Sequence, residues 1–238
     1  MKLVVLNHKM NINYGNLDKY ISDLKKVDSD NIELVVCPAN IYLLEFIKNG
    51  FSVGAQDVSM YDNGSYTGEV SASQLKSMGI KYCIVGHYER RTYFNESNSD
   101  ANRKIKQLLN NDIKVVVCLG ESLDDKNSGT GDSVIIKQLV ESLGDIDKKY
   151  SNNIIISYEP GWAIGSSVIP STNYIEKKIG LINTSLSNIG LENVRILYGG
   201  SVDDTNIEVL SQVEALDGFL IGSVGLDIDK LSNLTNKL

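Results

Sequence analysis

Eight short apolar runs recur along this chain, and the segments between them have apolar residues at helical spacing. Each run is nearly continuous in apolar residues, which is typical of parallel strands buried on both faces. The expected strands are residues 3–6, 32–37, 51–54, 82–85, 115–119, 154–157, 194–198 and 218–221. This alternation predicts one α/β domain that spans residues 1–238.

The helical segments are recognised by the period of their apolar positions. In the first of them, Leu17, Tyr20, Ile21 and Leu24 follow the i, i+3, i+4, i+7 pattern of an amphipathic helix. The expected helices are residues 17–26, 70–78, 102–109, 134–143, 174–186, 207–213 and 225–238, with a weaker case at 41–48. The polar stretch 124–132 is expected to be an exposed loop or the entry to a helix.

Two architectures share this pattern, namely an eight-stranded α/β barrel and a doubly wound open sheet. An open sheet often carries a glycine-rich phosphate-binding turn after its first strand. Here the first strand is followed by Asn-His-Lys-Met-Asn at residues 7–11, without a glycine. The sequence therefore favours a closed barrel of eight parallel strands ringed by helices.

Composition narrows the classes of partner. The net charge is −7 and no long basic stretch is present, so we expect neither nucleic acid nor an anionic membrane as a partner. No window approaches the roughly 18 apolar residues of a membrane span, and the N-terminus lacks the features of a signal peptide. The three cysteines are odd in number and far apart, which argues against a disulfide framework or a zinc site and favours a cytoplasmic location.

Polar residues follow several of the expected strands, at the rim where α/β barrels carry their catalytic groups. The first strand is followed by Asn7 and Lys9, the fourth by His87 and the sixth by Glu159, while the last two end in small-residue turns at 199–201 and 222–223. Taken alone, each has an ordinary explanation, such as a solvated lysine, a hydrogen-bonded histidine or a simple turn. Together they place a cation, an imidazole and a carboxylate on one rim, which indicates catalysis.

Longer motifs around these residues resemble those of the triosephosphate isomerase family, in order and spacing, over residues 3–226. They are Asn-His-Lys-Met-Asn at 7–11, Gly-Glu-Val-Ser at 68–71, Gly-His-Tyr-Glu-Arg-Arg at 86–91, Tyr-Glu-Pro-Gly-Trp-Ala-Ile-Gly at 158–165, Tyr-Gly-Gly-Ser-Val at 198–202 and Asp-Gly-Phe-Leu-Ile-Gly at 217–222. The resemblance implies a single TIM barrel. It also implies interconversion of dihydroxyacetone phosphate and D-glyceraldehyde 3-phosphate through an enediolate, in glycolysis and gluconeogenesis.

The resemblance assigns roles to four residues at the rim. Glu159 would be the base that removes the proton beside the substrate carbonyl. His87 would be the electrophile, and this family is itself the established example of a glutamate base paired with a neutral imidazole at a helix N-terminus. Lys9 would supply positive charge near the phosphate and the developing oxyanion, and Asn7 would add a hydrogen bond to the substrate. Residues 88–91 are expected to start a short helical turn that has His87 at its positive end.

Phosphate binding is expected to rely on backbone N–H groups as well as on Asn7 and Lys9. The residues that match the family's phosphate contacts are Gly165, Ser201, Gly222 and Ser223. A short helix after the eighth strand would direct its N-terminus at the phosphate. The segment from 160 to about 170 resembles the family's mobile lid, whose closure would exclude water from the enediolate.

The resemblance implies no metal and no organic cofactor, because the chemistry is proton transfer with oxyanion stabilisation. It also implies a homodimer, in which the loop 61–69 inserts beside the partner's active site and Thr67 reaches the partner's residues 7–11. The alternative function is a related barrel that binds a sugar phosphate but has lost or changed catalysis.

Several positions depart from the family pattern. His8 stands where tryptophan is usual, and its alternation with Asn7 and Lys9 predicts that it points away from the barrel mouth. Tyr88 stands where serine is usual, so its ring must either point away from the pocket or crowd it. Gly161 is expected to loosen the first hinge of the lid, whereas Pro170 restricts the second.

Four further residues match family positions without an assigned part in the chemistry. Arg90, Arg91 and Glu96 are expected to form structural charge pairs below the rim. Glu89 is expected either to tune the network of Lys9 and His87 or only to brace it.

Overall fold

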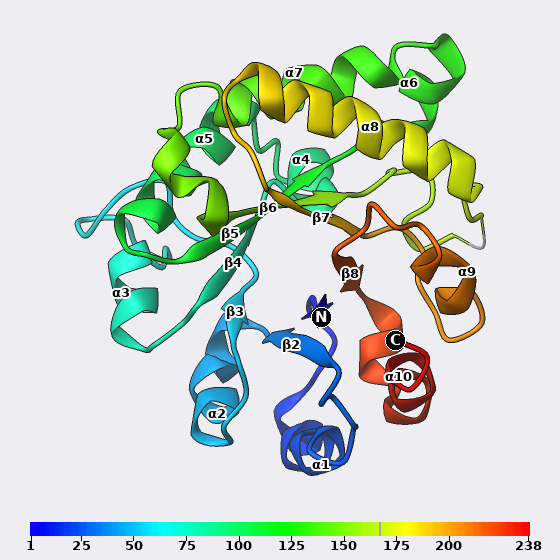
Figure 1. Ribbon diagram of the computed structural model, residues 1–238. Coiled ribbons are helices and arrows are strands. Elements are labelled where there is room, and N and C mark those ends of the chain that lie inside the picture. Colours follow the sequence, from blue (N-terminus) through cyan, green and yellow to red (C-terminus); the bar gives the residue numbers. More distant parts are fainter. Residues whose placement is uncertain (167) are drawn as a thin grey trace.

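The computed structural model describes residues 1–166 and 168–238. Its strands form one parallel sheet of eight in the order β2-β1-β8-β7-β6-β5-β4-β3, which curls into a barrel (Figure 1). The strands are β1 Lys2–Asn7, β2 Ile32–Cys37, β3 Gly54–Ala55, β4 Tyr82–Val85, β5 Lys114–Leu119, β6 Ile154–Tyr158, β7 Arg195–Tyr198 and β8 Gly218–Ile221. All eight expected strands are present, and the barrel prediction is confirmed.

The barrel closes between β2 and β3 through little backbone pairing. The two strands are joined by one isolated parallel bridge, between Val36 and Val53. The third strand was expected at 51–54, but regular pairing with β4 begins only at Gly54. The open-sheet alternative is nevertheless wrong, because this bridge brings the two ends of the strand order together.

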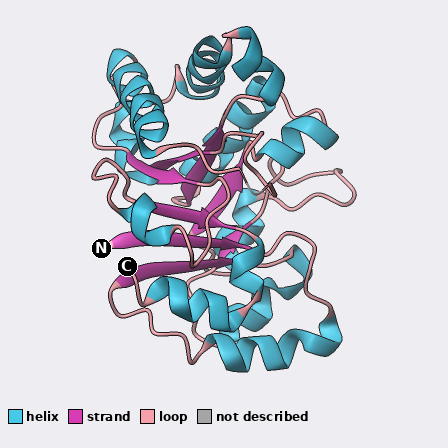
Figure 2. Cartoon of the chain, turned by 90° about the vertical axis from the view of Figure 1, so that its right-hand side faces the viewer, coloured by secondary structure: helices cyan, strands magenta, loops and turns pink. Residues whose placement is uncertain are grey.

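Helices surround the strands on the outside (Figures 1 and 2). Those of eight residues or more are α1 Tyr14–Leu24, α5 Asn98–Asn110, α7 Gly131–Leu143, α8 Thr172–Asn188 and α10 Ile228–Thr235. The shorter ones are α2 Leu43–Lys48, α3 Ala72–Ser77, α4 Tyr88–Tyr93, α6 Leu123–Ser128 and α9 Ile207–Ser211, together with the 3₁₀ helices η1 Asn40–Tyr42, η2 Lys148–Asn153 and η3 Ser223–Leu226. Among the described residues, none of these helices is long and apolar enough to cross a membrane.

Helix α6 overlaps the polar stretch 124–132, which was expected to be a loop or a helix entry and which ends in the first residues of α7. It buries none of its residues, so no apolar period marks it. A capping box stabilises it instead, in which Ser122 and Asp125 exchange side-chain and backbone hydrogen bonds. Its last turn ends at Gly129, which has the left-handed conformation of a helix C-cap.

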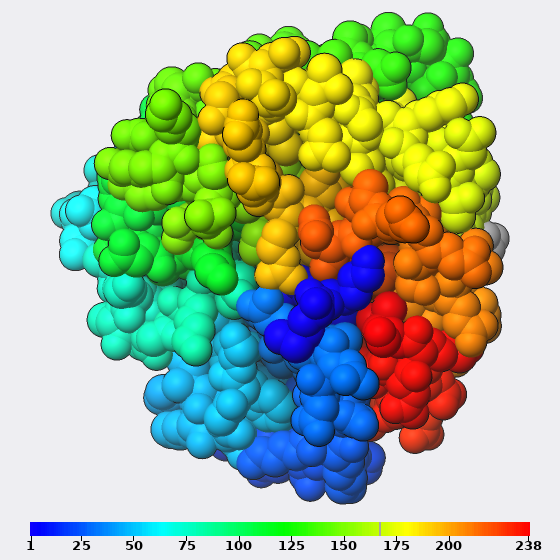
Figure 3. Space-filling view, in the orientation of Figure 1, coloured from blue at the N-terminus to red at the C-terminus, as the bar shows by residue number. Residues whose placement is uncertain are grey.

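Two apolar layers hold the fold together, one inside the barrel and one between strands and helices. Alternate residues of each strand divide between them: in β1, Leu3 and Val5 belong to the inner cluster and Val4 and Leu6 to the outer one. Figure 3 shows the face that carries the N-terminus, where side chains cover the end of the barrel. The interior is therefore packed, and the functional groups lie at the opposite, carboxyl ends of the strands.

Candidate active site

The end of β1 places Asn7 and Lys9 on the inner side of the barrel. Asn7 continues the inward parity of Leu3 and Val5 and is 5% exposed. His8 has the opposite parity, and its ring packs edge-on against Tyr20 and Phe46 in the outer layer. The prediction that His8 points away from the mouth is confirmed, and burial lowers its pKa to about 4.

Lys9 is held in an unusual backbone conformation. Its φ is 51°, in the left-handed region that few residues with a side chain adopt. Two side chains fix this turn, because Asn7 Oδ1 accepts from the Lys9 N–H over 3.0 Å and Gln56 Nε2 donates to the Lys9 carbonyl over 2.9 Å. The ammonium lies 2.6 Å from Glu89 Oε1, so a strained turn aims a charged side chain across the mouth.

His87 follows β4 at the N-terminus of α4, as expected. Its Nδ1 accepts a hydrogen bond from the backbone N–H of Glu89 over 3.3 Å. A ring nitrogen that accepts carries no proton, so in the neutral imidazole the proton is on Nε2. Nε2 faces the mouth, and the ring is therefore oriented to donate a hydrogen bond there.

Glu159 follows β6 and has the inward parity of Ile155 and Ser157. It is 1% exposed, and its Oε1 accepts from the Ser157 hydroxyl over 3.0 Å. Its Oε2 lies 3.4 Å from His87 Nε2 and has no hydrogen-bond partner within the described part of the chain. A β-carbon on Gly199 would lie 2.7 Å from the Glu159 Cγ, so a glycine is required beside the carboxylate.

Glu89 contacts both neighbours that the sequence linked to it. Its Oε1 pairs with the Lys9 ammonium, and its backbone N–H donates to His87 Nδ1 over 3.3 Å, whereas its Oε2 lies 3.6 Å from this nitrogen and makes no hydrogen bond to it. The side chain is about one-third exposed, which lets water screen the pair. Glu89 thus connects the cation and the imidazole of the candidate site directly.

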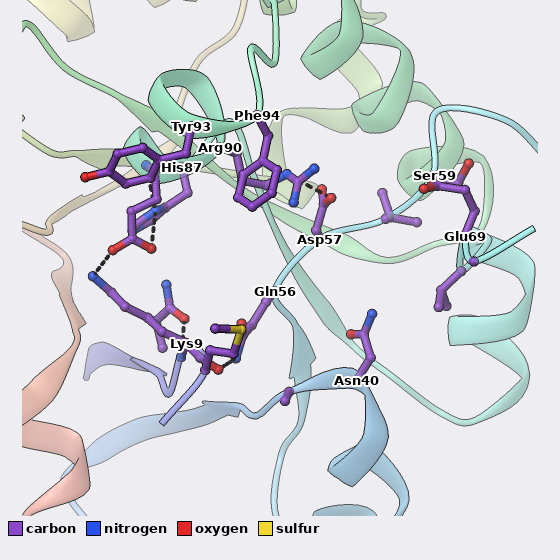
Figure 4. A pocket seen from close by; sticks show the side chains of 17 residues that line it. Lys9, Asn40, Gln56, Asp57, Ser59, Glu69, His87, Arg90, Tyr93 and Phe94 are labelled. Carbon is purple, nitrogen blue, oxygen red and sulfur yellow. Dashed lines mark hydrogen bonds and ion pairs between the residues drawn. The ribbon is translucent and has the colours of Figure 1, made fainter. Parts of the chain in front are cut away.

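A partly buried cluster of charges lies beneath the rim, in which Glu96 and Lys104 are buried and Arg90 is about one-third exposed. Glu96 Oε2 lies 2.6 Å from Arg90 Nε and 2.7 Å from Lys104 Nζ. Asp57 pairs with the same two cations, and Figure 4 shows its pair with Arg90. Burial would raise the pKa of Glu96, but Lys104 and Arg90 outweigh it and lower the pKa, whereas burial dominates at Asp57 and raises its pKa. The expected structural pairs at Arg90 and Glu96 are confirmed, and Asp57 and Lys104 complete them. The pair expected at Arg91 is absent among the described residues, because this side chain donates to the Gly86 and Cys118 carbonyls and to Asn98 Oδ1 instead.

The cluster holds the backbone that presents His87. Glu96 Oε1 accepts from the Gly86 N–H over 3.0 Å, and Arg91 Nε donates to the Gly86 carbonyl over 2.7 Å. Gly86 itself has φ +72°, which favours glycine. The backbone N–H and carbonyl of Gly86 are therefore both held by charged side chains, which fixes the backbone that carries His87.

The residues expected to bind phosphate lie on three loops. Gly222 is close to Lys9, since a β-carbon on it would lie 3.6 Å from the lysine Cε, and η3 begins directly after it. The short helix expected after the eighth strand is therefore present. The Ser201 hydroxyl lies 2.6 Å from the carbonyls of both Ala163 and Ser166, so the β7 loop contacts the lid. The backbone N–H groups of Gly165, Ser201 and Ser223 have no hydrogen-bond partner among the described residues.

The lid is anchored by a carboxylate that sequence reasoning did not single out. Oε1 of the buried Glu121 accepts from Trp162 Nε1 over 3.0 Å, and from the hydroxyls of Tyr158 and Tyr174 over 3.0 Å and 2.8 Å. The only signal available in the sequence was its place just after β5. The expected lid includes Ser167, which lies outside the described residues.

Tyr88 lies against the lid. A β-carbon on Gly161 would lie 2.2 Å from the Tyr88 Cε2, so the ring packs directly on this glycine. In the described part of the chain, no three histidine, cysteine or acidic side chains are grouped so that they could hold a metal ion.

Comparison with known proteins agrees with this geometry. The family model for triosephosphate isomerase matches residues 2–238. The chain belongs to the triosephosphate isomerase family. Its relatives include the triosephosphate isomerases of Finegoldia magna, 37% identical over 98% of this chain and 97% of the relative, and of Francisella tularensis subsp. mediasiatica, 34% identical over 100% and 98%. A more distant one, from Francisella philomiragia, is 31% identical over 99% and 96%.

Membership of the triosephosphate isomerase family confirms the predicted isomerase and its class of substrate, a triose phosphate. The relatives from Francisella tularensis and Finegoldia magna each align with at least 98% of this chain, so the family assignment applies to the barrel as a whole.

Proposed function

We propose that this chain interconverts dihydroxyacetone phosphate and D-glyceraldehyde 3-phosphate, with Glu159 as the base and His87 as the electrophile, within one domain formed by residues 1–238. The observation that carries this assignment is the 3.4 Å separation of Glu159 Oε2 and His87 Nε2, both buried and supplied by different strands. A carboxylate oxygen without a hydrogen-bond partner can accept a proton from carbon, and a neutral imidazole can donate to oxygen.

The reaction follows from these two groups. Glu159 takes the proton from the carbon beside the carbonyl, and the electrons of that C–H bond shift to give an enediolate. His87 Nε2–H and the Lys9 ammonium stabilise the negative charge that develops on oxygen. Glu159 then returns the proton to the neighbouring carbon, while the hydroxyl proton passes from one oxygen of the enediolate to the other, where His87 Nε2 can relay it. Both the carbon-bound and the oxygen-bound protons are thereby conserved, no electrons are gained or lost, and neither a metal nor a redox cofactor is called for.

Phosphate binding is assigned to the N–H groups of Gly165, Ser201, Gly222 and Ser223, assisted by Lys9 and Asn7. Small residues and the start of η3 let backbone donors approach the phosphate closely. This arrangement explains how a protein with a net charge of −7 can bind an anion without a cluster of arginines.

A coupled assay of the purified protein with glyceraldehyde 3-phosphate tests the proposal. We expect turnover in the forward and reverse directions without added metal, and unchanged turnover in the presence of a chelator. Saturable binding of glycerol 3-phosphate without turnover would instead support the alternative, a sugar-phosphate-binding barrel that has lost catalysis.

We further propose that the protein is a homodimer assembled through the loop 61–69. In this loop the rings of Tyr61 and Tyr66 stack with centroids 4.3 Å apart, which gives the loop a rigid base, and Thr67 at its tip is exposed. A groove of about 680 Å³ lies beside the active site (Figure 4). It is lined by Met10, Phe94 and Tyr93, which are 95%, 67% and 71% exposed, and these apolar surfaces suit a partner's loop.

A cytoplasmic location is part of the same proposal. Cys37, Cys83 and Cys118 are all free thiols and all buried, which suits a reducing compartment. Cell fractionation with an antibody against the protein would test this location.

A further inference from the structure

The ring of Tyr88 and the backbone of Gly161 form a size-matched contact. A β-carbon on Gly161 would lie 2.2 Å from Cε2, 2.7 Å from Cδ2 and 2.8 Å from Cζ of Tyr88. Carbon atoms that are not bonded approach each other to about 3.5–4.0 Å. The ring therefore occupies the volume that any other side chain at position 161 would require.

The glycine at 161 is explained by this ring and not by its backbone conformation. Gly161 lies outside the left-handed region, in contrast to Gly165, whose φ is +63°. Its N–H donates to the Glu121 carbonyl over 2.9 Å, and the Ala163 N–H closes a turn onto the Pro160 carbonyl over 2.8 Å. The expectation that Gly161 loosens the first hinge is not needed to explain the residue, because Gly161 lies in a hydrogen-bonded turn that tolerates a β-carbon wherever space exists.

The contact joins the two chain segments that carry the proposed base and electrophile. Tyr88 directly follows His87, and Gly161 is two residues beyond Glu159. A cavity of only about 10 Å³ is lined by both Tyr88 and Glu159, so these two residues lie near each other. No hydrogen bond of the Tyr88 hydroxyl is present among the described residues, which leaves ring packing as the interaction.

We propose that Tyr88 is a positioning residue, whose ring fits against Gly161 and holds the first turn of the lid so that Glu159 faces His87. This inference rests on the proposed roles of Glu159 and His87. The ring acts through the lid and does not touch the reacting atoms, so its removal changes how often the base is aligned and not which groups react.

The experiment is a double-mutant cycle of Tyr88→Ser and Gly161→Ala, measured as kcat and KM with glyceraldehyde 3-phosphate. The fluorescence of Trp162, the only tryptophan in the chain, reports the lid directly when glycerol 3-phosphate is added. Gly180→Ala is the matched control, because this glycine lies in α8 and a β-carbon on it would have nothing within 4 Å.

We expect Gly161→Ala alone to lower kcat by about 10–100-fold, because the methyl group displaces the ring or the turn, while KM changes little. In the Tyr88→Ser background the same substitution should cost much less, because the space is then open. The response of Trp162 should be lost in the Gly161→Ala variant and return in the double variant, while Gly180→Ala leaves both readouts unchanged.

Two results would overturn the proposal: an equal loss of kcat in both backgrounds, or no loss of kcat in the Gly161→Ala variant. Absence of isomerase turnover in the unmodified protein would instead contradict the proposed function. In that case the Trp162 fluorescence and the thermal unfolding midpoints still complete the cycle, and additive midpoints together with additive Trp162 responses would reject the Tyr88–Gly161 coupling independently.

Discussion

Glu159 Oε2 lies 3.4 Å from His87 Nε2 across the mouth of the barrel, with both side chains buried. Glu159→Gln keeps the shape of the side chain but removes the charge that accepts a proton. We expect kcat to fall about 10²–10⁴-fold, the usual contribution of a general base, while the affinity for glycerol 3-phosphate is retained. Kinetics and isothermal titration calorimetry measure the two quantities, and near-normal turnover would rule out the assignment of the base.

Lys9→Met tests the cation. Loss of the ammonium removes the positive charge beside the phosphate site and leaves Glu89 unpaired at the mouth. We expect kcat/KM to fall roughly 10²–10³-fold, with a raised KM, because both the substrate and the enediolate carry negative charge. Restoration of activity by raised salt would argue against this role, because screening cannot replace a charge placed at the reacting oxygen.

Glu96→Gln tests the partly buried cluster beneath the rim. The substitution removes the buried negative charge beside the buried Lys104, and we expect a loss of about 3 kcal/mol in the free energy of unfolding. Denaturant titration measures this loss. Lys19→Ala, which breaks the exposed pair with Asp23, is the control and should have little effect.

The burial of His8 predicts that the stability of the fold depends on pH. Burial lowers its pKa from 6.5 to about 4, so the unfolded chain binds a proton between these values that the folded chain does not. Stability should therefore fall as the pH is lowered from 6.5 to 4, by up to about 3 kcal/mol from this residue. His8→Phe should flatten that part of the curve, because it removes the titrating imidazole. Tyr20 loses its 2.9 Å hydrogen bond to His8 Nε2 but keeps the one to the Gly225 carbonyl. Parallel curves for the two proteins, measured by urea unfolding, would contradict the assignment.

Thr67→Arg tests the proposed dimer. A long charged side chain at the exposed tip of the loop 61–69 should not fit the partner's groove, and we expect the dimer to dissociate. Sedimentation velocity measures the change, with Thr184→Arg on the exposed side of α8 as a control for the added charge. An unmodified protein that sediments as an active monomer would refute the proposal.

Sequence reasoning succeeded where a local pattern has one structural meaning. Buried parallel strands are recognised by their continuous apolar runs. The alternation of side chains along β1 correctly predicted that His8 points away from the barrel mouth, unlike Asn7 and Lys9. It was incomplete where stability comes from hydrogen bonds without burial: the stretch 124–132 is mostly exposed and leads into α7, as expected, but it also contains most of α6, whose capping box at Ser122 and Asp125 was the one available sign.

The sequence also did not predict which distant residues pair with each other. Arg90 and Glu96 were recognised as structural, but their neighbours Asp57 and Lys104 come from other elements, so no spacing links them. For Tyr88 the sequence left two orientations open. Only the three-dimensional structure shows that the Tyr88 ring occupies the space that a side chain at position 161 would need, because this depends on the contact of two loops.

The single bridge between Val36 and Val53 makes the β2–β3 junction the thinnest part of the barrel wall. The Gln56 amide reinforces it by donating to the carbonyls of Cys37 and Lys9, which connects this junction to the catalytic turn. Amide protons there should exchange with solvent sooner than those of β5 and β6. Local opening at this junction would disturb Lys9 while most of the protein stays folded, so heat would abolish turnover before it unfolds the chain.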